Sequence, residues 1–310
     1  MSVEAPAPVD RLAAEPAWQP GEERERRQPL ELVGWVALIA LAPGTLLYLS
    51  FNAGGYFPSA DGLVAIVLAQ ALVARTILAE RPFQGFSRAL CVPLAALSLY
   101  GAWQLASMLW SHADARALDA YDRTLVYVLA LALFGSVRHT PARLRWLMRA
   151  VFAGLAAVCL AGLISRVLPH LWPTAASFYD SRLSYPLTYW NAEGMIAALA
   201  LILGVHLSAA PGERALVRVL AAALGPALAA TLLLTFSRGS LAVAVVGVLA
   251  YCLLARASTL PTTLLAVGAP CALALRAAYD ATLLATSHAS TPAAVAQGQH
   301  VALVVGACML

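Results

Sequence analysis

The sequence predicts an all-α integral membrane protein, a polytopic bundle of about nine or ten transmembrane helices. Three observations lead to this prediction: 61% of the 310 residues are hydrophobic, only 12% are charged, and the apolar residues gather in runs as long as a membrane span. A soluble domain of this size cannot hide so much apolar surface. A lipid bilayer is therefore the expected environment of most of the chain.

Individual helices follow from the polar residues that separate the apolar runs. A membrane-spanning helix needs roughly 20 apolar residues, and clusters of Arg, Pro and Asp divide the sequence into pieces of about that size. We expect helices over 31–52, 61–79, 89–110, 121–137, 147–168, 189–208, 217–236, 240–255 and 262–279, with a further apolar run from about residue 300.

The apolar run over residues 219–255 is too long for one crossing. Its one strongly polar interruption is the sequence Ser-Arg-Gly-Ser that begins at Ser237. This interruption predicts a hairpin turn that contains Arg238, and Gly239 is expected to supply the turn conformation.

Two domains are expected from the distribution of charge. Residues 1–30 contain Pro, Ala, Glu and Arg without an apolar run, which is typical of a disordered tail. Residues 31–310 are expected to form the transmembrane domain. Because the tail lacks the apolar segment of a signal peptide, the first helix is expected to remain as a signal anchor.

The arginines are divided unevenly between alternate loops, and basic residues near helix ends are retained on the cytoplasmic side. Fourteen of the 20 basic residues fall in one set of loops: Arg11, Arg24, Arg26, Arg27, Arg75, Arg81, Arg88, Arg138, Arg143, Arg145, Arg149, Arg214, Arg218 and Arg256. The other set holds Arg116, Arg123, Arg166, Arg182, Arg238 and Arg276. The N-terminus is therefore expected in the cytoplasm, with a bacterial inner membrane as the location that the family resemblance below implies.

Several functional classes are not indicated. No basic segment is dense enough, or interleaved with aromatic residues, to suggest a nucleic-acid partner. The five cysteines fall singly inside apolar runs, without the close pairs of a metal or redox site. No P-loop, dinucleotide fingerprint or metal-ligand spacing occurs, so neither a cofactor nor a metal is expected.

Arg182 and Arg238 are the strongest candidates for a binding site. An ionisable group near membrane depth costs roughly 2.5 to 3.5 kcal/mol on insertion scales and is by default a functional hypothesis. Both arginines are expected on the outer face, beside the N-termini of the sixth and eighth helices, where N–H groups and helix dipoles favour an anion such as phosphate. We therefore expect the two to line the rim of one cavity and bind an anion there.

Plainer interpretations remain open. Arg238 could extend to the outer headgroups, and Asn191 could be the N-cap of the sixth helix, with Glu193 in its first turn. The aromatic residues Tyr185, Tyr189 and Trp190 are typical of any membrane interface.

Two further arginines could add to the same outer basin, or pair locally with neighbouring acids. Arg123 has Asp119 and Asp122 nearby, and Arg276 has Asp280. The outer histidines, His112, His170 and His288, are expected to be solvated.

Two segments resemble a known family. One runs from Arg182 to Asn191 (Arg-Leu-Ser-Tyr-Pro-Leu-Thr-Tyr-Trp-Asn), and the other from Leu234 to Gly239 (Leu-Thr-Phe-Ser-Arg-Gly). Together they are similar to the O-antigen ligase and polymerase superfamily of bacterial membrane glycosyltransferases, over about residues 180–255. The resemblance implies transfer of a glycan from undecaprenyl diphosphate to an acceptor hydroxyl at the outer face of the inner membrane, in cell-surface polysaccharide assembly.

By this resemblance Arg182 and Arg238 would hold the diphosphate, while Tyr189, Asn191 and Ser237 would orient it or the first sugar. No catalytic base is assigned. Family members continue into a large external loop with a histidine, whereas His288 and His300 match no such motif, so the domain is expected to be incomplete at its C-terminus and slow in turnover. The alternatives are a multi-pass anion or solute transporter and an inactive membrane scaffold.

Overall fold

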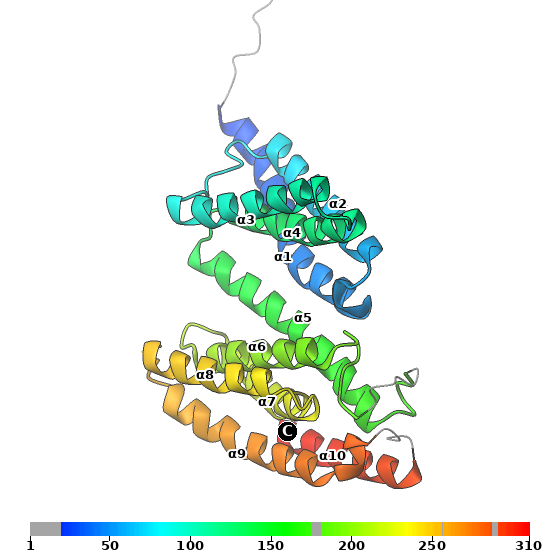
Figure 1. Cartoon of the computed structure of the whole chain (residues 1–310). Coiled ribbons are helices and arrows are strands. Elements are labelled where there is room, and N and C mark those ends of the chain that lie inside the picture. Colours follow the sequence, from blue (N-terminus) through cyan, green and yellow to red (C-terminus); the bar gives the residue numbers. More distant parts are fainter. Residues whose placement is uncertain (1–19, 175–180, 256, 287–290) are drawn as a thin grey trace, which may run out of the picture. The chain divides into compact units, whose positions relative to one another are not determined.

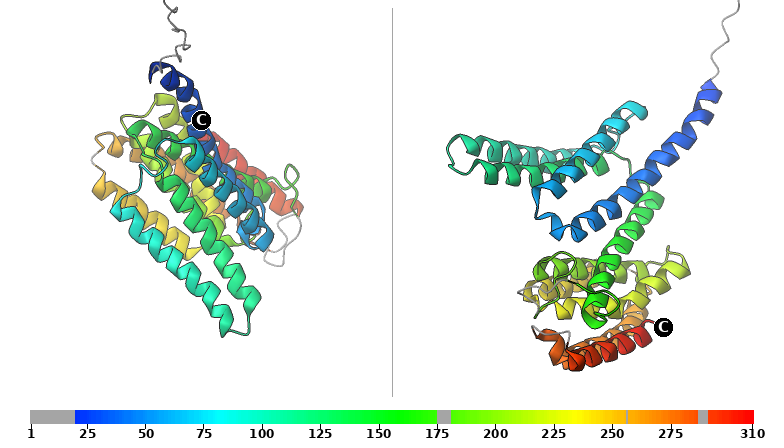
Figure 2. Two further views of the ribbon diagram at one scale, coloured as in Figure 1. Left: turned by 90° about the horizontal axis from the view of Figure 1, so that it is seen from above. Right: turned by 90° about the vertical axis from the view of Figure 1, so that its right-hand side faces the viewer.

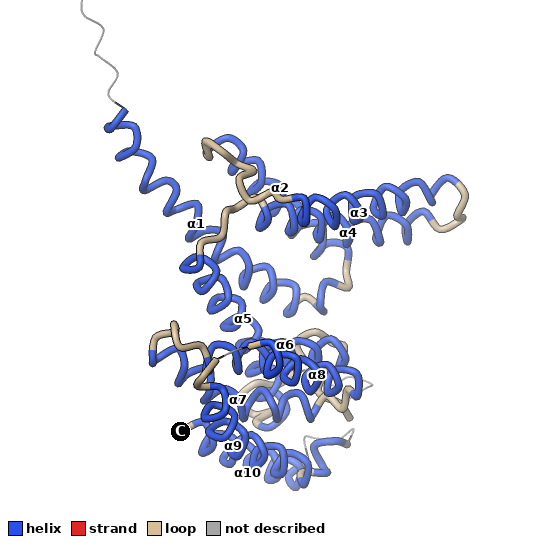
Figure 3. The backbone as a smooth tube through the Cα atoms, turned by 90° about the vertical axis from the view of Figure 1, so that its left-hand side faces the viewer, coloured by secondary structure: helices blue, strands red, loops and turns tan. Residues whose placement is uncertain are grey.

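The protein is all-α wherever its structure is described. The computed structural model describes residues 20–174, 181–255, 257–286 and 291–310, and the regular elements in these ranges are all helices (Figure 3). The α-helices are α1 (Pro20–Phe51), α2 (Pro58–Leu78), α3 (Arg88–Ala106), α4 (Asp114–Gly135), α5 (Pro141–Val167), α6 (Trp190–Ala209), α7 (Ala215–Leu234), α8 (Arg238–Leu254), α9 (Leu260–Asp280) and α10 (Pro292–Met309). Three 3-10 helices accompany them: η1 (Ala53–Gly55), η2 (Ser107–Leu109) and η3 (Thr282–Ala285).

Seven helices of the described chain are long and apolar enough to cross a membrane: α1 from Val33 onward, α2, α3 with η2, α5, α6, α7 and α9. α8 is equally apolar but has only 17 residues. Large apolar side chains point outward from these helices, among them Ile77, Leu99 and Leu253, which are 75%, 73% and 85% exposed. Lipid is the solvent that such surfaces need, so the predicted multi-pass helical membrane protein is confirmed.

The chain divides into two compact units, residues 1–37 and 38–310. α1 starts at Pro20, whereas the first helix was expected to start at residue 31. Glu, Arg and Gln, which are strong helix formers, occupy residues 22–28, between Gly21 and Pro29. Residues 1–19 lie outside the described part of the chain.

Most helices begin earlier than the apolar runs predict, and four of them begin at a hydroxyl cap. Ser87, Thr140, Ser237 and Thr291 each accept a hydrogen bond from the backbone N–H three residues further on. After α1, the largest difference is at α10, which starts at Pro292 rather than near residue 300. Apolar length alone therefore underestimates these helices.

Within residues 38–310, α6 and α7 are the central helices (Figures 1 and 2). α6 packs against α5, α7 and α8, while α7 also packs against α9 and α10. Small residues allow close approach between membrane helices: a Cβ at Gly194 of α6 would lie 2.8 Å from both the Ser240 and the Thr235 hydroxyl oxygens. α4 packs against both α2 and α3, with Gly101 of α3 facing Tyr121 of α4.

Candidate functional site

The turn between α7 and α8 is fixed by its own hydroxyl groups. Thr235 Oγ1 accepts a hydrogen bond from the Ser237 N–H at 3.3 Å, and Ser237 Oγ accepts one from the Ser240 N–H at 3.3 Å. Ser237 is therefore the N-cap of α8. Arg238, the next residue, is placed in the first turn of α8 as a consequence.

The residue that makes the turn is Phe236 and not Gly239. Phe236 adopts the left-handed conformation with φ of 50°, whereas Gly239 lies inside the first turn of α8 with open space where a Cβ would be. The expectation that Gly239 supplies the turn conformation is thus wrong. The hydrogen bonds to the Thr235 and Ser237 hydroxyl groups complete the turn before Gly239. A non-glycine residue with positive φ is uncommon and costs about 1 to 3 kcal/mol.

The loop that precedes α6 is held beside this turn. The Leu183 N–H donates a hydrogen bond to the Leu234 carbonyl oxygen at 2.9 Å, which joins the loop to the end of α7. Further along, Trp172 Nε1 donates to the Tyr185 hydroxyl at 2.9 Å, and the Phe51 ring packs against both aromatic rings. The two segments that carry the family resemblance are therefore in direct contact.

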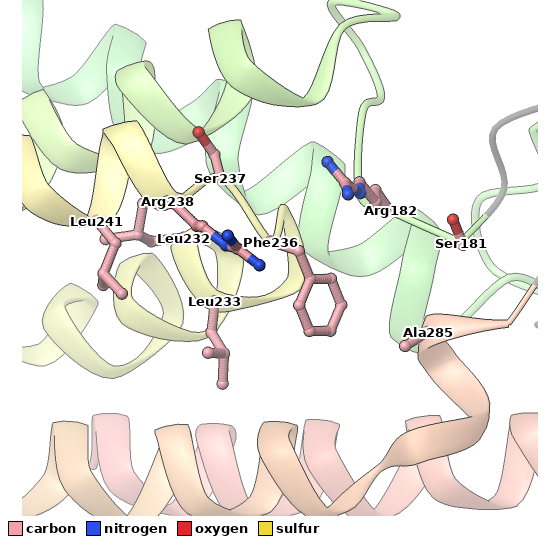
Figure 4. Close-up of a pocket in the computed structure, with 9 residues that line it drawn as sticks. All are labelled: Ser181, Arg182, Leu232, Leu233, Phe236, Ser237, Arg238, Leu241 and Ala285. Carbon is pink, nitrogen blue, oxygen red and sulfur yellow. The ribbon is translucent and has the colours of Figure 1, made fainter.

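Arg182 and Arg238 line one cavity of about 420 Å³, hereafter the arginine cavity. Figure 4 shows Arg238 on the helical side, Arg182 on the loop side, and the Phe236 ring between them in that view. The lining consists of Ser181, Arg182, Leu232, Leu233, Phe236, Ser237, Arg238, Leu241 and Ala285. The prediction that the two arginines share one cavity is confirmed.

The charge of this cavity is positive over the described residues. No acidic residue is among its described lining, and the described part of the chain gives neither Arg182 nor Arg238 an ion pair. The Arg182 guanidinium carbon lies 5.1 Å from the centre of the Trp190 ring, a cation–π contact that orients it. Two exposed guanidiniums beside a helix N-terminus can bind the oxygens of a phosphate group bidentately.

Ser237 lines the same cavity, but its hydroxyl also has a structural role. It lies 2.8 Å from Ser240 Oγ, which in turn donates to the Asn191 carbonyl oxygen at 3.2 Å. This chain of contacts connects the start of α8 to the start of α6. Orientation of a ligand by Ser237 stays a prediction.

Tyr189 and Asn191 lie outside the arginine cavity. α6 begins at Trp190, so Tyr189 is its N-cap position and Asn191 falls in the first turn. The N-cap interpretation of Asn191 is therefore wrong. Asn191 Nδ2 instead donates to the Tyr189 hydroxyl at 2.7 Å, and Tyr189 lines a different cavity.

Glu193 is completely buried, at 0% exposure. Both carboxylate oxygens are without a hydrogen-bond partner among the described residues. The side chain faces α5, where a Cβ on Gly162 would lie 2.9 Å from Glu193 Oε1 and 2.6 Å from the Tyr185 carbonyl oxygen. Glu193 thus belongs to the helix interface and not to the arginine cavity.

A second cavity of about 590 Å³ contains Asp61 and Arg123, and we call it the ion-pair cavity. Arg123 Nε lies 3.4 Å from Asp61 Oδ2, and the Arg123 guanidinium donates to the Tyr56 carbonyl oxygen at 3.1 Å. The expected pairing of Arg123 with acids of its own helix is wrong, because α2 packs on α4 and places Asp61 opposite. The lining is Leu49, Ala53, Gly54, Gly55, Tyr56, Asp61, Arg123, Val126, Tyr127, Leu187, Thr188, Tyr189 and Ala192.

The remaining candidates lie elsewhere. Arg276 pairs with Asp280 at 2.7 Å within α9, which confirms the local interpretation. His112, His170 and His300 are exposed, and His288 lies outside the described residues. Over the described ranges, no group of three His, Cys, Asp or Glu side chains could hold a metal ion.

Sequence reasoning missed Asp61, although a signal existed. Asp61 is an acidic residue in the first turn of an otherwise apolar membrane helix, and an ionisable residue in such a helix is itself a functional hypothesis. Tyr127 and Thr188 gave no such signal, because tyrosine and threonine are ordinary in membrane helices and loops.

The fold and this site define a class, a multi-pass α-helical membrane protein with two polar cavities of different charge at one end of its helices. Comparison with known proteins gives no match of this chain to a family model, a curated protein or a solved structure.

Proposed function

We propose that the protein is an O-antigen ligase-like membrane glycosyltransferase that transfers a glycan from undecaprenyl diphosphate to an acceptor hydroxyl. One observation carries the proposal. The two segments that resemble the family are joined by the Leu183–Leu234 backbone hydrogen bond, and their arginines, Arg182 and Arg238, line a single cavity without a described acidic residue.

The chemistry of the reaction fits a cavity of this kind. The acceptor oxygen forms a bond to the anomeric carbon, and the bond from that carbon to the diphosphate oxygen breaks. The electron pair stays on the diphosphate, and the acceptor proton passes to the outer aqueous phase. Fixed guanidiniums at the leaving oxygen, here Arg182 and Arg238, stabilise the developing charge.

The proposal includes an orientation. α6 and α8 begin, and α7 ends, beside the arginine cavity, so all three helix ends lie on one side of the membrane. The arginine distribution favours the periplasmic side for these ends, with the N-terminus in the cytoplasm of a bacterial cell.

Cysteine labelling tests the orientation directly. In a cysteine-free background and in cells with a permeabilised outer membrane, an impermeant maleimide should label a cysteine near Arg116 but not one near Arg145. Labelling near Arg145 would reverse the orientation and place the arginine cavity in the cytoplasm.

Binding of a diphosphate lipid tests the site. The purified chain in neutral nanodiscs is titrated with farnesyl diphosphate, a short isoprenoid diphosphate. Arg238→Lys keeps the charge but removes the bidentate fork, and we expect about tenfold weaker binding, since a charge-assisted hydrogen bond contributes about 1.5 to 3 kcal/mol. The matched control is Arg276→Lys, which changes an exposed arginine of α9. Equal affinity of Arg238→Lys, Arg238→Ala and the unchanged protein would overturn the proposal.

Glu193 favours a second candidate, a transporter of small anions. A buried carboxyl without a partner in a membrane helix is typical of ion-coupled transport, and Glu193 has both properties among the described residues. Proteoliposomes loaded with buffer should then take up radiolabelled phosphate, and Glu193→Gln should abolish the uptake. No uptake above protein-free liposomes would exclude this candidate.

A further inference from the structure

The ion-pair cavity differs from the arginine cavity in its net charge. Its guanidinium, Arg123, is compensated by the Asp61 carboxylate at 3.4 Å. The Asp61 side chain is only 9% exposed, while the Arg123 side chain is 45% exposed. Because the two charges cancel, the cavity holds strong donors and acceptors but offers no net attraction to an anion.

Three tyrosines line the same cavity and are largely exposed. Tyr56 is 69% exposed, Tyr127 60% and Tyr189 51%. Aromatic rings of this kind provide flat apolar faces with a hydroxyl at the rim. The Tyr189 hydroxyl is held in place by its hydrogen bond from Asn191 Nδ2 at 2.7 Å.

Two non-glycine residues that line the cavity have a left-handed backbone conformation. Ala53 and Thr188 have φ of 55° and 62°, and the glycines between Ala53 and Tyr56 have φ of 68° and 75°. Such strain clusters at ligand-binding sites. A Cβ on the second of these glycines, Gly55, would lie 2.6 Å from Asp61 Oδ1, so only glycine allows the carboxylate to sit against this backbone.

We propose that the ion-pair cavity is a binding site for a neutral saccharide. The Asp61 carboxylate accepts from sugar hydroxyls and the Arg123 guanidinium donates to them, while the tyrosine faces cover the C–H surface of the ring. A cavity of about 590 Å³ has room for one or two sugar units. The proposed saccharide binding is argued from these contacts alone. Its role, to hold the sugar part of a substrate, rests on the proposed function.

The position of the loop before α6 supports this role. Arg182 lines the arginine cavity, and residues 187–189 line the ion-pair cavity. One short segment therefore contributes to both, as expected where an anionic head and a neutral sugar are bound by neighbouring sites.

Saturation-transfer NMR on the full chain in neutral nanodiscs tests the proposal, with maltose, lactose, cellobiose and N,N′-diacetylchitobiose as probes. At least one should bind, and Asp61→Asn should weaken it by about tenfold, as expected for loss of a charged hydrogen-bond acceptor. The matched control is Asp280→Asn, the acid of the exposed Arg276 ion pair, which should have no effect. Tyr127→Ala, at an exposed position, gives a second variant that does not disturb a buried group.

Dodecyl maltoside and dodecyl lactoside form the second arm, with octaethylene glycol dodecyl ether as the headgroup control. Binding of the free disaccharides indicates recognition of a soluble saccharide, and binding of the alkyl glycosides alone indicates a lipid-linked one; both support the site. Binding by neither set of probes would overturn the site. So would Asp61→Asn and Tyr127→Ala variants that bind as tightly as the unchanged protein. Failure of the Arg238 titration with farnesyl diphosphate would overturn the transferase and leave this site standing.

Discussion

The two cavities beside the loop before α6 contain the same kind of cation but balance it differently. In the arginine cavity, Arg182 and Arg238 have no acidic partner among the described residues, and the wall between them is the apolar Phe236. In the ion-pair cavity, Arg123 is paired with Asp61 and surrounded by tyrosines. Under the proposed function, an arginine near the membrane surface indicates an anion site only when no acid is packed against it.

The difference arises from which helices meet at each place. The arginine cavity is built around the turn from α7 to α8, where hydroxyl groups make the structural contacts. The ion-pair cavity contains the first turn of α2, which brings in Asp61. The residue packed beside the arginine, and not the arginine itself, therefore decides whether the cavity carries a net charge.

Arg238→Glu should have the largest effect of the changes considered. It removes an attractive charge and adds a repulsive one, and like-charge contacts cost several kcal/mol, so farnesyl diphosphate should bind about 100-fold more weakly. Disaccharide binding should stay within about twofold. Titration of one preparation with both probes measures this, and a parallel loss of both would show that the two cavities are not independent.

Gly194→Val should damage the framework of the arginine cavity. The new side chain would meet the Ser240 and Thr235 hydroxyls, and such overpacking costs about 1 to 3 kcal/mol of the free energy of unfolding. Thermal unfolding in detergent measures the change. Gly239→Ala, with open space around it, is the control, and an equal loss in that variant would mean that the contact at Gly194 is unimportant.

Asp61→Asn should convert the ion-pair cavity into a weak anion site. Without the buried Asp61 carboxylate, the half-exposed Arg123 guanidinium is uncompensated, and a solvent-screened charge of this kind contributes up to about 1 kcal/mol to binding. In an Arg238→Ala background, where the first site is impaired, we expect about a fivefold gain in farnesyl diphosphate affinity. A further decrease would contradict the role given to charge balance.

The smallest expected effect is that of salt, which should weaken ligand binding in one cavity more than in the other. Raising the ionic strength from about 0.1 M to 1 M shortens the Debye length from about 10 Å to 3 Å. Farnesyl diphosphate should then bind severalfold more weakly, while disaccharide affinity should be nearly constant. Equal salt sensitivity of the two probes would argue against a charge difference between the sites.

The candidate site was partly accessible to prediction. The pairing of Arg182 with Arg238 followed from two hairpin ends on one face, and the structure places both in one cavity. The positions of Tyr189 and Asn191 did not follow, because α6 begins at Trp190 and directs Tyr189 toward α2 and α4. The direction of a side chain at a helix start changes by about 100° with each residue of shift, which sequence boundaries do not resolve.

The sequence by itself determined the helical membrane fold. The length of an apolar run and the arginines between runs are local properties, and the bilayer acts on them without any contact between distant segments. It also located the hairpin at Arg238. Only the tertiary structure decided that Arg123 pairs with Asp61 across two helices, and that Glu193 is buried between α5 and α6. These depend on contacts between segments distant in the chain, and no local pattern of residues specifies which helix faces which.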